Sequence, residues 1–198
     1  MTKDICSVDG RVAIITGASS RGIGKCAAKE LAAHGAKVCL VARREEKLQA
    51  AVVEIEQSGG TAMYVVADVS KEDDCVKAID ACVAKFGQLD IMVLASGVAG
   101  TPVQTLDEMF DTDEYRRVLS INLDGVFFMV KYGYNECAKG GHGSIVFINS
   151  LAGFKAAGFI PYSASKGAIR AWTKLFAKRF APLGVRVNAI IPGMIDTE

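Results

Sequence analysis

The chain has 198 residues, 51% of them hydrophobic, and its 23 Lys and Arg residues nearly balance 22 Asp and Glu residues. The apolar fraction excludes intrinsic disorder, and the near-neutral charge argues against a nucleic-acid partner, which requires clustered basic residues. This length suits one domain with a sizeable core, so we expect residues 1–198 to form a single domain.

Six short runs of apolar, largely β-branched residues predict strands. Most of these runs are apolar at consecutive positions instead of alternate ones, which is typical of a parallel sheet covered on both faces. Burial on both faces also accounts for the high mean hydropathy of +0.26. The predicted strands are Arg11–Thr16, Lys37–Ala42, Ala62–Ala67, Leu89–Ala95, Ser144–Asn149 and Arg186–Ile190.

Five longer stretches lie between these strands and predict helices. Two of them end at a glycine, Gly35 and Gly87, as helices commonly do. Ser70-Lys71-Glu72-Asp73 has the pattern of a capping box and predicts the start of the third helix. Strands that alternate with helices are the pattern of a doubly wound α/β fold. The predicted helices are Ile23–His34, Glu45–Gln57, Ser70–Phe86, Asp113–Lys139 and Tyr162–Pro182.

The sequence gives no sign of a membrane span, a secretory signal or a metal site. No uninterrupted apolar run approaches the roughly 18 residues that a spanning helix needs, and the first residues lack a long apolar segment. The six cysteines form no C-x-x-C pair, and His34 and His142 have no Cys or His partner at ligand spacing. We therefore expect a cytoplasmic protein with reduced thiols, no membrane partner and no metal.

A glycine-rich turn follows the first predicted strand and opens the first predicted helix. Gly17, Gly22 and Gly24 in this turn let the backbone approach a pyrophosphate closely, and the helix N-terminus directs free N–H groups at the anion. The alternative is an ordinary tight turn between a strand and a helix. Its place after the first strand favours dinucleotide binding.

With Tyr162-Ser163-Ala164-Ser165-Lys166 downstream, this turn resembles the short-chain dehydrogenase/reductase family. The resemblance covers essentially the whole chain, because further matching segments occur in the family's order. They are Ala67-Asp68-Val69, Asn122 in Ser120-Ile121-Asn122-Leu123, Ser150 in Asn149-Ser150-Leu151-Ala152-Gly153, and Pro192-Gly193. The resemblance implies a Rossmann fold with strand order 3-2-1-4-5-6 and a nicotinamide cofactor.

Tyr162 and Lys166 are four residues apart, so on a helix they share one face. A lysine ammonium near a tyrosine favours the phenolate and so eases proton exchange. The resemblance implies that Tyr162 transfers the substrate proton, Lys166 binds the nicotinamide ribose, Ser150 holds the substrate oxygen and Asn122 holds a water. The plainer alternatives are a surface Tyr–Lys pair, a strand-end hydroxyl and a buried amide that joins two elements.

The residues after the second predicted strand favour NADP(H), although NAD(H) is possible. Ala42 stands where NAD-specific folds usually have an acid, and Arg43 and Arg44 follow it at a helix start. A 2′-phosphate suits these arginines, whereas the alternative is a solvated charge run. The predicted cofactor contacts are Gly17, Ser19, Arg21, Gly22, Ile23, Gly24, Arg43, Arg44, Asp68, Val69, Gly97, Tyr162, Lys166, Pro192 and Gly193.

The sequence departs from the family's pattern at four places. The glycine turn has four residues between Gly17 and Gly22, one more than usual, and Ser150 precedes Tyr162 by twelve residues, one fewer than expected. Leu94-Ala95-Ser96-Gly97 replaces Asn-Asn-Ala-Gly, so two amides that brace the sheet are lost. The sequence also lacks the family's last strand and the segment that covers the substrate.

The resemblance implies an oxidoreductase that interconverts a small secondary alcohol and a ketone. A 3-oxoacyl-thioester reductase and an alcohol or hydroxysteroid dehydrogenase both fit the motifs. The lost asparagines and the short C-terminal end favour an alternative, a catalytically impaired nucleotide-binding interaction subunit or a fragment of such an enzyme. The long fourth and fifth helices resemble the family's subunit-packing pair, so we expect a homo-oligomer, a dimer or a tetramer.

Overall fold

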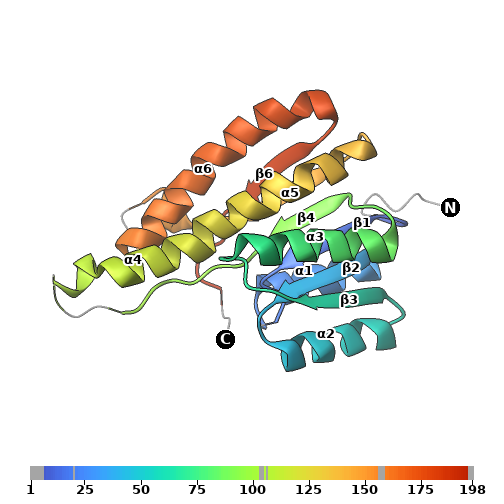
Figure 1. Cartoon of the computed structure of the whole chain (residues 1–198), viewed down its shortest axis with the longest axis horizontal. Coiled ribbons are helices and arrows are strands. Elements are labelled where there is room, and N and C mark those ends of the chain that lie inside the picture. The colour runs from blue at the N-terminus through green and yellow to red at the C-terminus, as the bar shows by residue number, and fades with distance from the viewer. Residues whose placement is uncertain (1–6, 20, 103–104, 106, 156–158, 196–198) are drawn as a thin grey trace.

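A computed structural model describes residues 7–19, 21–102, 105, 107–155 and 159–195. Its core is a parallel sheet of six strands in the order β3-β2-β1-β4-β5-β6, which confirms the predicted doubly wound fold (Figure 1). The strands are β1 (Val12–Thr16), β2 (Lys37–Ala42), β3 (Thr61–Val66), β4 (Ile91–Leu94), β5 (Ser144–Ile148) and β6 (Arg186–Ile190).

Helices cover both faces of this sheet, and each face has its own core. Val12 and Ile14 of β1 pack into one core, whereas Ala13 and Ile15 of the same strand pack into the other. The consecutive apolar residues that predicted the strands are therefore buried on alternate faces. The helices are α1 (Ile23–Ala33), α2 (Glu45–Gln57), α3 (Glu72–Phe86), α4 (Thr112–Leu119), α5 (Gly125–Lys139) and α6 (Ile160–Phe180).

The bounds of several predicted strands shift by one to two residues at an end, as for β4, predicted as Leu89–Ala95. Three features of the predicted helices also differ from the structure. The fourth predicted helix is divided into α4 and α5 by a π-helical segment, Ser120–Asp124. Helix α6 begins at Ile160, two residues earlier than predicted, with a proline in its first turn. The capping box is wrong, because Lys71 is the N-cap of α3 and Ser70 donates its hydroxyl hydrogen bond to Asp68.

None of the helices in the described part of the chain has both the length and the apolar character of a membrane span. Cys26, Cys39, Cys75, Cys82 and Cys137 are free thiols, and all except Cys26 are buried.

Asp90 holds together the amino ends of three strands. Asp90 is 5% exposed. Its carboxylate accepts hydrogen bonds from the Val12 N–H and from the Gln88 side-chain amide, each at 2.8 Å. Arg11 Nη1 lies 3.4 Å from one carboxylate oxygen, and His142 Nε2 lies 2.9 Å from it. This buried carboxylate therefore connects β1 and β4 with the loop before β5.

An Asp90→Ala variant tests this connection. The substitution leaves several donors without their acceptor, among them a buried N–H, so we expect a loss of about 2–4 kcal/mol in the free energy of unfolding. Urea denaturation measures the loss. Asp113→Ala is the control, because that side chain is 97% exposed and its loss should cost roughly 0.5 kcal/mol or less. Equal stabilities for the two variants would contradict the assigned role of Asp90.

Candidate active site

The glycine-rich turn after β1 packs directly against the end of β4. Gly17 has a φ of +68°, and a Cβ built on it would lie 2.8 Å from the Ala95 carbonyl oxygen, so a side chain is excluded there. A Cβ on Gly24 would lie 2.6 Å from the Gly17 carbonyl oxygen. The turn therefore lies flat on the carboxyl edge of the sheet and leaves the start of α1 open to a ligand.

Two adjoining cavities follow this edge of the sheet. The first has a volume of about 280 Å³ and the second about 340 Å³. They share Gly17, Ala95, Gly97 and Val98, so together they form one elongated cleft beside the glycine-rich turn. This shape and the bare glycine backbone fit an extended ligand with a phosphate near its middle.

Nearly all predicted site residues line these two cavities. In the first are Gly17, Gly22, Ile23, Gly24, Gly97, Ser150, Tyr162, Lys166, Pro192 and Gly193. In the second are Gly17, Ser19, Arg43, Arg44, Asp68, Val69 and Gly97. Two predicted residues line neither cavity: Arg21 is exposed, and Asn122 is buried beneath the cleft.

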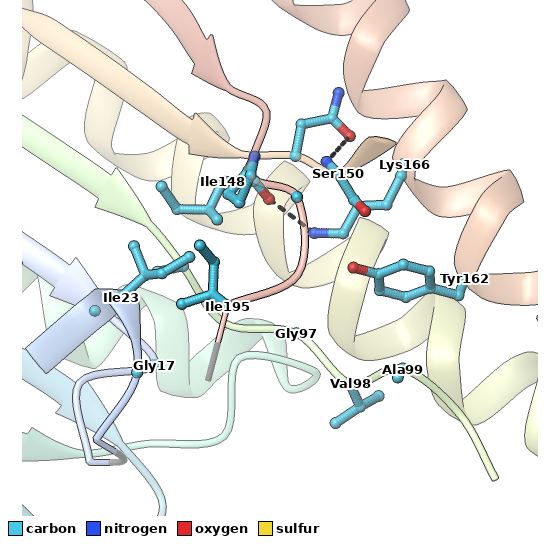
Figure 2. Close-up of a pocket in the computed structure, with 16 residues that line it drawn as sticks. Gly17, Ile23, Gly97, Val98, Ala99, Ile148, Ser150, Tyr162, Lys166 and Ile195 are labelled. Atoms are coloured by element: carbon cyan, nitrogen blue, oxygen red, sulfur yellow. Dashed lines mark hydrogen bonds between the residues drawn. The ribbon is translucent and has the colours of Figure 1, made fainter. Parts of the chain in front are cut away.

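Ser150, Tyr162 and Lys166 meet in the first cavity, where Tyr162 directs its hydroxyl toward Ser150 and Lys166 (Figure 2). Ser150 follows the end of β5 by two residues and is the N-cap of a short 3-10 helix, Leu151–Gly153, where its hydroxyl accepts a hydrogen bond from the Ala152 N–H at 3.2 Å. Tyr162 and Lys166 lie one turn apart on α6, with Lys166 Nζ 5.5 Å from the centre of the Tyr162 ring. Two hydroxyls and an ammonium therefore converge on one small volume.

Lys166 is 5% exposed, and its ammonium donates a hydrogen bond of 2.7 Å to the Ile148 carbonyl oxygen at the end of β5. Burial lowers the pKa of Lys166 to about 8, because a charged ammonium is costly away from water. The group therefore favours any negative charge brought into the cavity.

Asn122 lies in the π-helical segment and braces the chain that follows β4. Its amide oxygen accepts from the Val98 N–H at 2.8 Å, and its amide nitrogen donates to the Val98 carbonyl at 2.9 Å. The same nitrogen donates a hydrogen bond of 3.3 Å to the Ser165 hydroxyl, which in turn donates one to the Tyr162 carbonyl oxygen. These contacts fit the alternative role of a buried amide joining two elements, and the water-holding role stays a prediction.

Thr16 supplies a brace where the family's asparagines are absent. Its hydroxyl oxygen accepts hydrogen bonds from the Ala95 and Ser96 N–H groups, both at 3.1 Å. The end of β4 is thus held from β1 by Thr16 and from the π-helical segment by Asn122. The replacement of two asparagines by Leu94 and Ala95 leaves this edge of the sheet connected.

The second cavity has the arginines at its wall. Arg44 Nε donates a hydrogen bond of 3.3 Å to the Ser19 hydroxyl in the glycine-rich turn. Burial of Asp68 raises its pKa, but hydrogen bonds from Ser70 and the positive charge of Arg43 outweigh burial, so the net pKa shift is downward. Asp68 therefore remains an ionised hydrogen-bond acceptor inside a cavity whose other charges are positive.

Several residues that line the cavities belong to no recognisable motif and were not predicted from the sequence. The apolar wall includes Ile148, Ile195 and Val98. Ser96, directly before Gly97 in the chain, lines the second cavity. Asn149 also lines the first cavity, and its amide oxygen accepts the Ser150 N–H at 2.9 Å. The position of Asn149 directly before Ser150 was the one signal that the sequence offered.

A family model described as short chain dehydrogenase matches residues 11–198. The chain is 37% identical over 189 residues to 2,5-dichloro-2,5-cyclohexadiene-1,4-diol dehydrogenase of Sphingobium indicum, covering 95% of this chain and 74% of the relative. It is 38% identical over 192 residues to the A-factor type gamma-butyrolactone 1′-reductase of Streptomyces virginiae, covering 95% of this chain and 73% of the relative. Among solved structures, an NAD⁺-bound xylitol dehydrogenase is similar to this chain with a TM-score of 0.87 and 34% identity. The match covers 93% of this chain and 70% of the xylitol dehydrogenase chain.

The buried Lys166 predicts a pH dependence of stability. An unfolded lysine has a pKa near 10.4, whereas folded Lys166 has a pKa of about 8. Between these values the unfolded chain binds more protons, so the free energy of unfolding rises with pH. Relative to Lys166→Met, which lacks the titrating group, the wild type should gain about 2 kcal/mol between roughly pH 7.5 and 9.5.

Urea denaturation at both pH values measures this gain. Lys174→Met is the matched control, because Lys174 is exposed on the same helix and its loss should produce no comparable pH dependence. A constant stability difference between the wild type and Lys166→Met would contradict the burial of the ammonium.

Proposed function

The chain belongs to the short-chain dehydrogenase family, and we propose that it is an NADP(H)-dependent oxidoreductase that interconverts a secondary alcohol and a ketone. Relatives named as dehydrogenases and as reductases support the reaction class. The convergence of Ser150, Tyr162 and Lys166 on one cavity carries the proposal for this chain. A ketone oxygen needs a proton donor and a hydrogen-bond partner as it becomes an alcohol, and this cavity offers both.

Tyr162 transfers the proton at the substrate oxygen in this proposal. Its hydroxyl points into the cavity beside Ser150, which positions the same oxygen by a hydrogen bond (Figure 2). The Lys166 ammonium, 5.5 Å from the tyrosine ring centre, stabilises the negative charge that the phenol oxygen acquires after donating its proton. Hydrogen bonds of Asn122 connect α6 with the segment after β4, so Asn122 positions Tyr162 indirectly.

The glycine-rich edge fits a nicotinamide dinucleotide, because the turn lines both cavities and, without side chains at Gly17 and Gly24, packs tightly on backbone that any Cβ would strike. When bound, the cofactor supplies or accepts the hydride. Gly17, Gly22 and the start of α1 would hold its phosphates, Asp68 and Val69 its adenosine, and Lys166 with Pro192 and Gly193 its nicotinamide end.

Preference for NADP(H) rests on the charges of the second cavity. Arg43 and Arg44 line it, Ala42 stands in the position that an NAD-specific acid would occupy, and Arg44 is tied to the phosphate turn through Ser19. Arginine is well suited to a 2′-phosphate because its guanidinium group offers several donors. One solved relative carries NAD⁺, so membership in the family does not decide between NAD(H) and NADP(H). Arg43 and Arg44 are the residues that favour NADP(H) in this chain.

The outer surface of α5 and α6 supports a homo-oligomer. Phe127 on α5 and Leu175 on α6 are exposed, and Trp172 contacts Phe127 with ring centres 6.1 Å apart. Exposed apolar side chains gathered on two neighbouring helices are typical of a protein–protein interface. We propose that a second copy of the chain covers this surface.

Turnover tests the proposed function most simply. The protein is mixed with NADPH and a panel of ketones, and with NADP⁺ and the matching alcohols, and nicotinamide absorbance is followed. Consumption of NADPH by at least one neutral ketone is the expected result. Tight NADPH binding with no turnover of any compound would instead support a nucleotide-binding subunit without catalysis.

Arg43→Ala tests the cofactor preference. The loss of a charge-assisted contact to the 2′-phosphate should raise the Michaelis constant for NADPH roughly tenfold or more. The constant for NADH should change less than about twofold, because NADH lacks that phosphate. Arg116→Ala on the exposed surface of α4 is the control and should leave both constants unchanged. Equal use of both cofactors by the wild type would contradict the preference.

A further inference from the structure

A separate, smaller cavity of about 140 Å³ lies between the segment that follows β4 and the start of α6. Its apolar lining includes Met109, Phe159, Ile160 and Pro161, with Tyr115 beside them. Met109 belongs to a short 3-10 helix, Glu108–Phe110, that precedes α4. The volume is close to that of apolar protein cavities of about 150 Å³ that take up benzene, so it suits one six-membered ring.

This cavity adjoins the candidate active site along two chain segments. Gly100 lines it, and the preceding residue, Ala99, lines the active-site cavity. Pro161 lines it as well, and the next residue, Tyr162, points its hydroxyl into the active site (Figure 2). The two cavities share no lining residue, but consecutive residues of these two segments line them, so the apolar cavity lies next to the end of the active site that holds Tyr162.

Glu114 forms a fixed wall of the cavity. Its carboxylate accepts hydrogen bonds from the Thr101 N–H at 2.6 Å and from Arg117 Nε and Nη2 at 2.6 and 2.8 Å. These hydrogen bonds, above all those from Arg117, lower the pKa of Glu114 to about 2. Because its acceptor positions are occupied within the protein, Glu114 shapes the cavity and does not supply a ligand contact.

The chain beside this cavity carries an excess of negative charge. Residues 107–117 contain five carboxylates, Asp107, Glu108, Asp111, Asp113 and Glu114, against two guanidinium groups, Arg116 and Arg117. Arg117 is paired with Glu114, and Arg116 lies 3.8 Å from Asp113. Phosphate groups near this segment would be repelled.

We propose that this cavity holds an uncharged ring carried by the substrate, so that the enzyme acts on neutral ring-bearing alcohols or ketones and not on phosphate-bearing acyl thioesters. This inference rests on the proposed function. It selects between the two substrate classes that the sequence motifs leave open, because an uncharged ring suits the apolar lining, whereas a phosphate-bearing carrier would be repelled by the net negative charge beside it.

A matched pair of ketones tests the inference. 4-Phenyl-2-butanone and 2-butanone differ by one phenyl group, and the wild type should use the phenyl compound with a kcat/KM at least roughly tenfold higher. Met109→Trp fills the cavity and should remove this advantage while leaving kcat/KM for 2-butanone and the NADPH affinity unchanged. Phe110→Trp is the control, because Phe110 is 73% exposed on the same short helix and should keep the advantage.

The outcomes separate the two proposals. No turnover of any ketone in the panel overturns the proposed function and the inference with it. Turnover of other ketones in the panel without turnover of 4-phenyl-2-butanone overturns the inference alone. Equal kcat/KM for the two ketones, or an advantage that survives in Met109→Trp, overturns the inference alone.

A second pair of substrates tests the charge argument. Acetoacetyl-coenzyme A and the uncharged acetoacetyl-N-acetylcysteamine carry the same reacting ketone. The inference predicts a higher kcat/KM for the uncharged thioester at low salt, with the difference shrinking as ionic strength rises. A higher value for the coenzyme A compound overturns it.

Discussion

A single buried ammonium ties together two of the elements that form the candidate active site. Lys166 is almost completely removed from water, and its hydrogen bond to the Ile148 carbonyl ties α6 to the last residue of β5. A buried cation with a neutral partner has a depressed pKa, here about 8. The charge is therefore tolerated where it can stabilise an anion, and Tyr162 and the adjoining cleft lie within its reach.

The cleft itself depends on the close approach of β1 and β4. Gly17 permits this approach because it has no side chain, and Thr16 accepts two hydrogen bonds from the backbone that follows β4. Asn122 then holds the next residues through both atoms of its amide. These neutral contacts fix the floor of the cleft, while Lys166, Arg43 and Arg44 supply positive charge along its length.

The strands, the glycine-rich turn and the shared face of Tyr162 and Lys166 were predicted from local period and spacing. The sheet order and the meeting of Ser150 with that pair were predicted from the resemblance to a known family. The brace from Thr16 was not predicted, since a hydroxyl that accepts two N–H groups from another strand leaves no local pattern. The capping box failed because Asp68 competes for the Ser70 hydroxyl. The π-helical segment was also missed, because a single wide turn leaves the apolar periodicity of a helix nearly intact.

In the proposed enzyme Tyr162 transfers the proton, while the rest of the cleft binds the cofactor. The most direct measurement compares Tyr162→Phe with the wild type in ketone reduction and in NADPH binding by fluorescence. Removal of the proton donor should lower kcat/KM by about 100-fold or more and leave the NADPH affinity within roughly twofold of the wild type. Full activity in the phenylalanine variant would contradict this role of Tyr162.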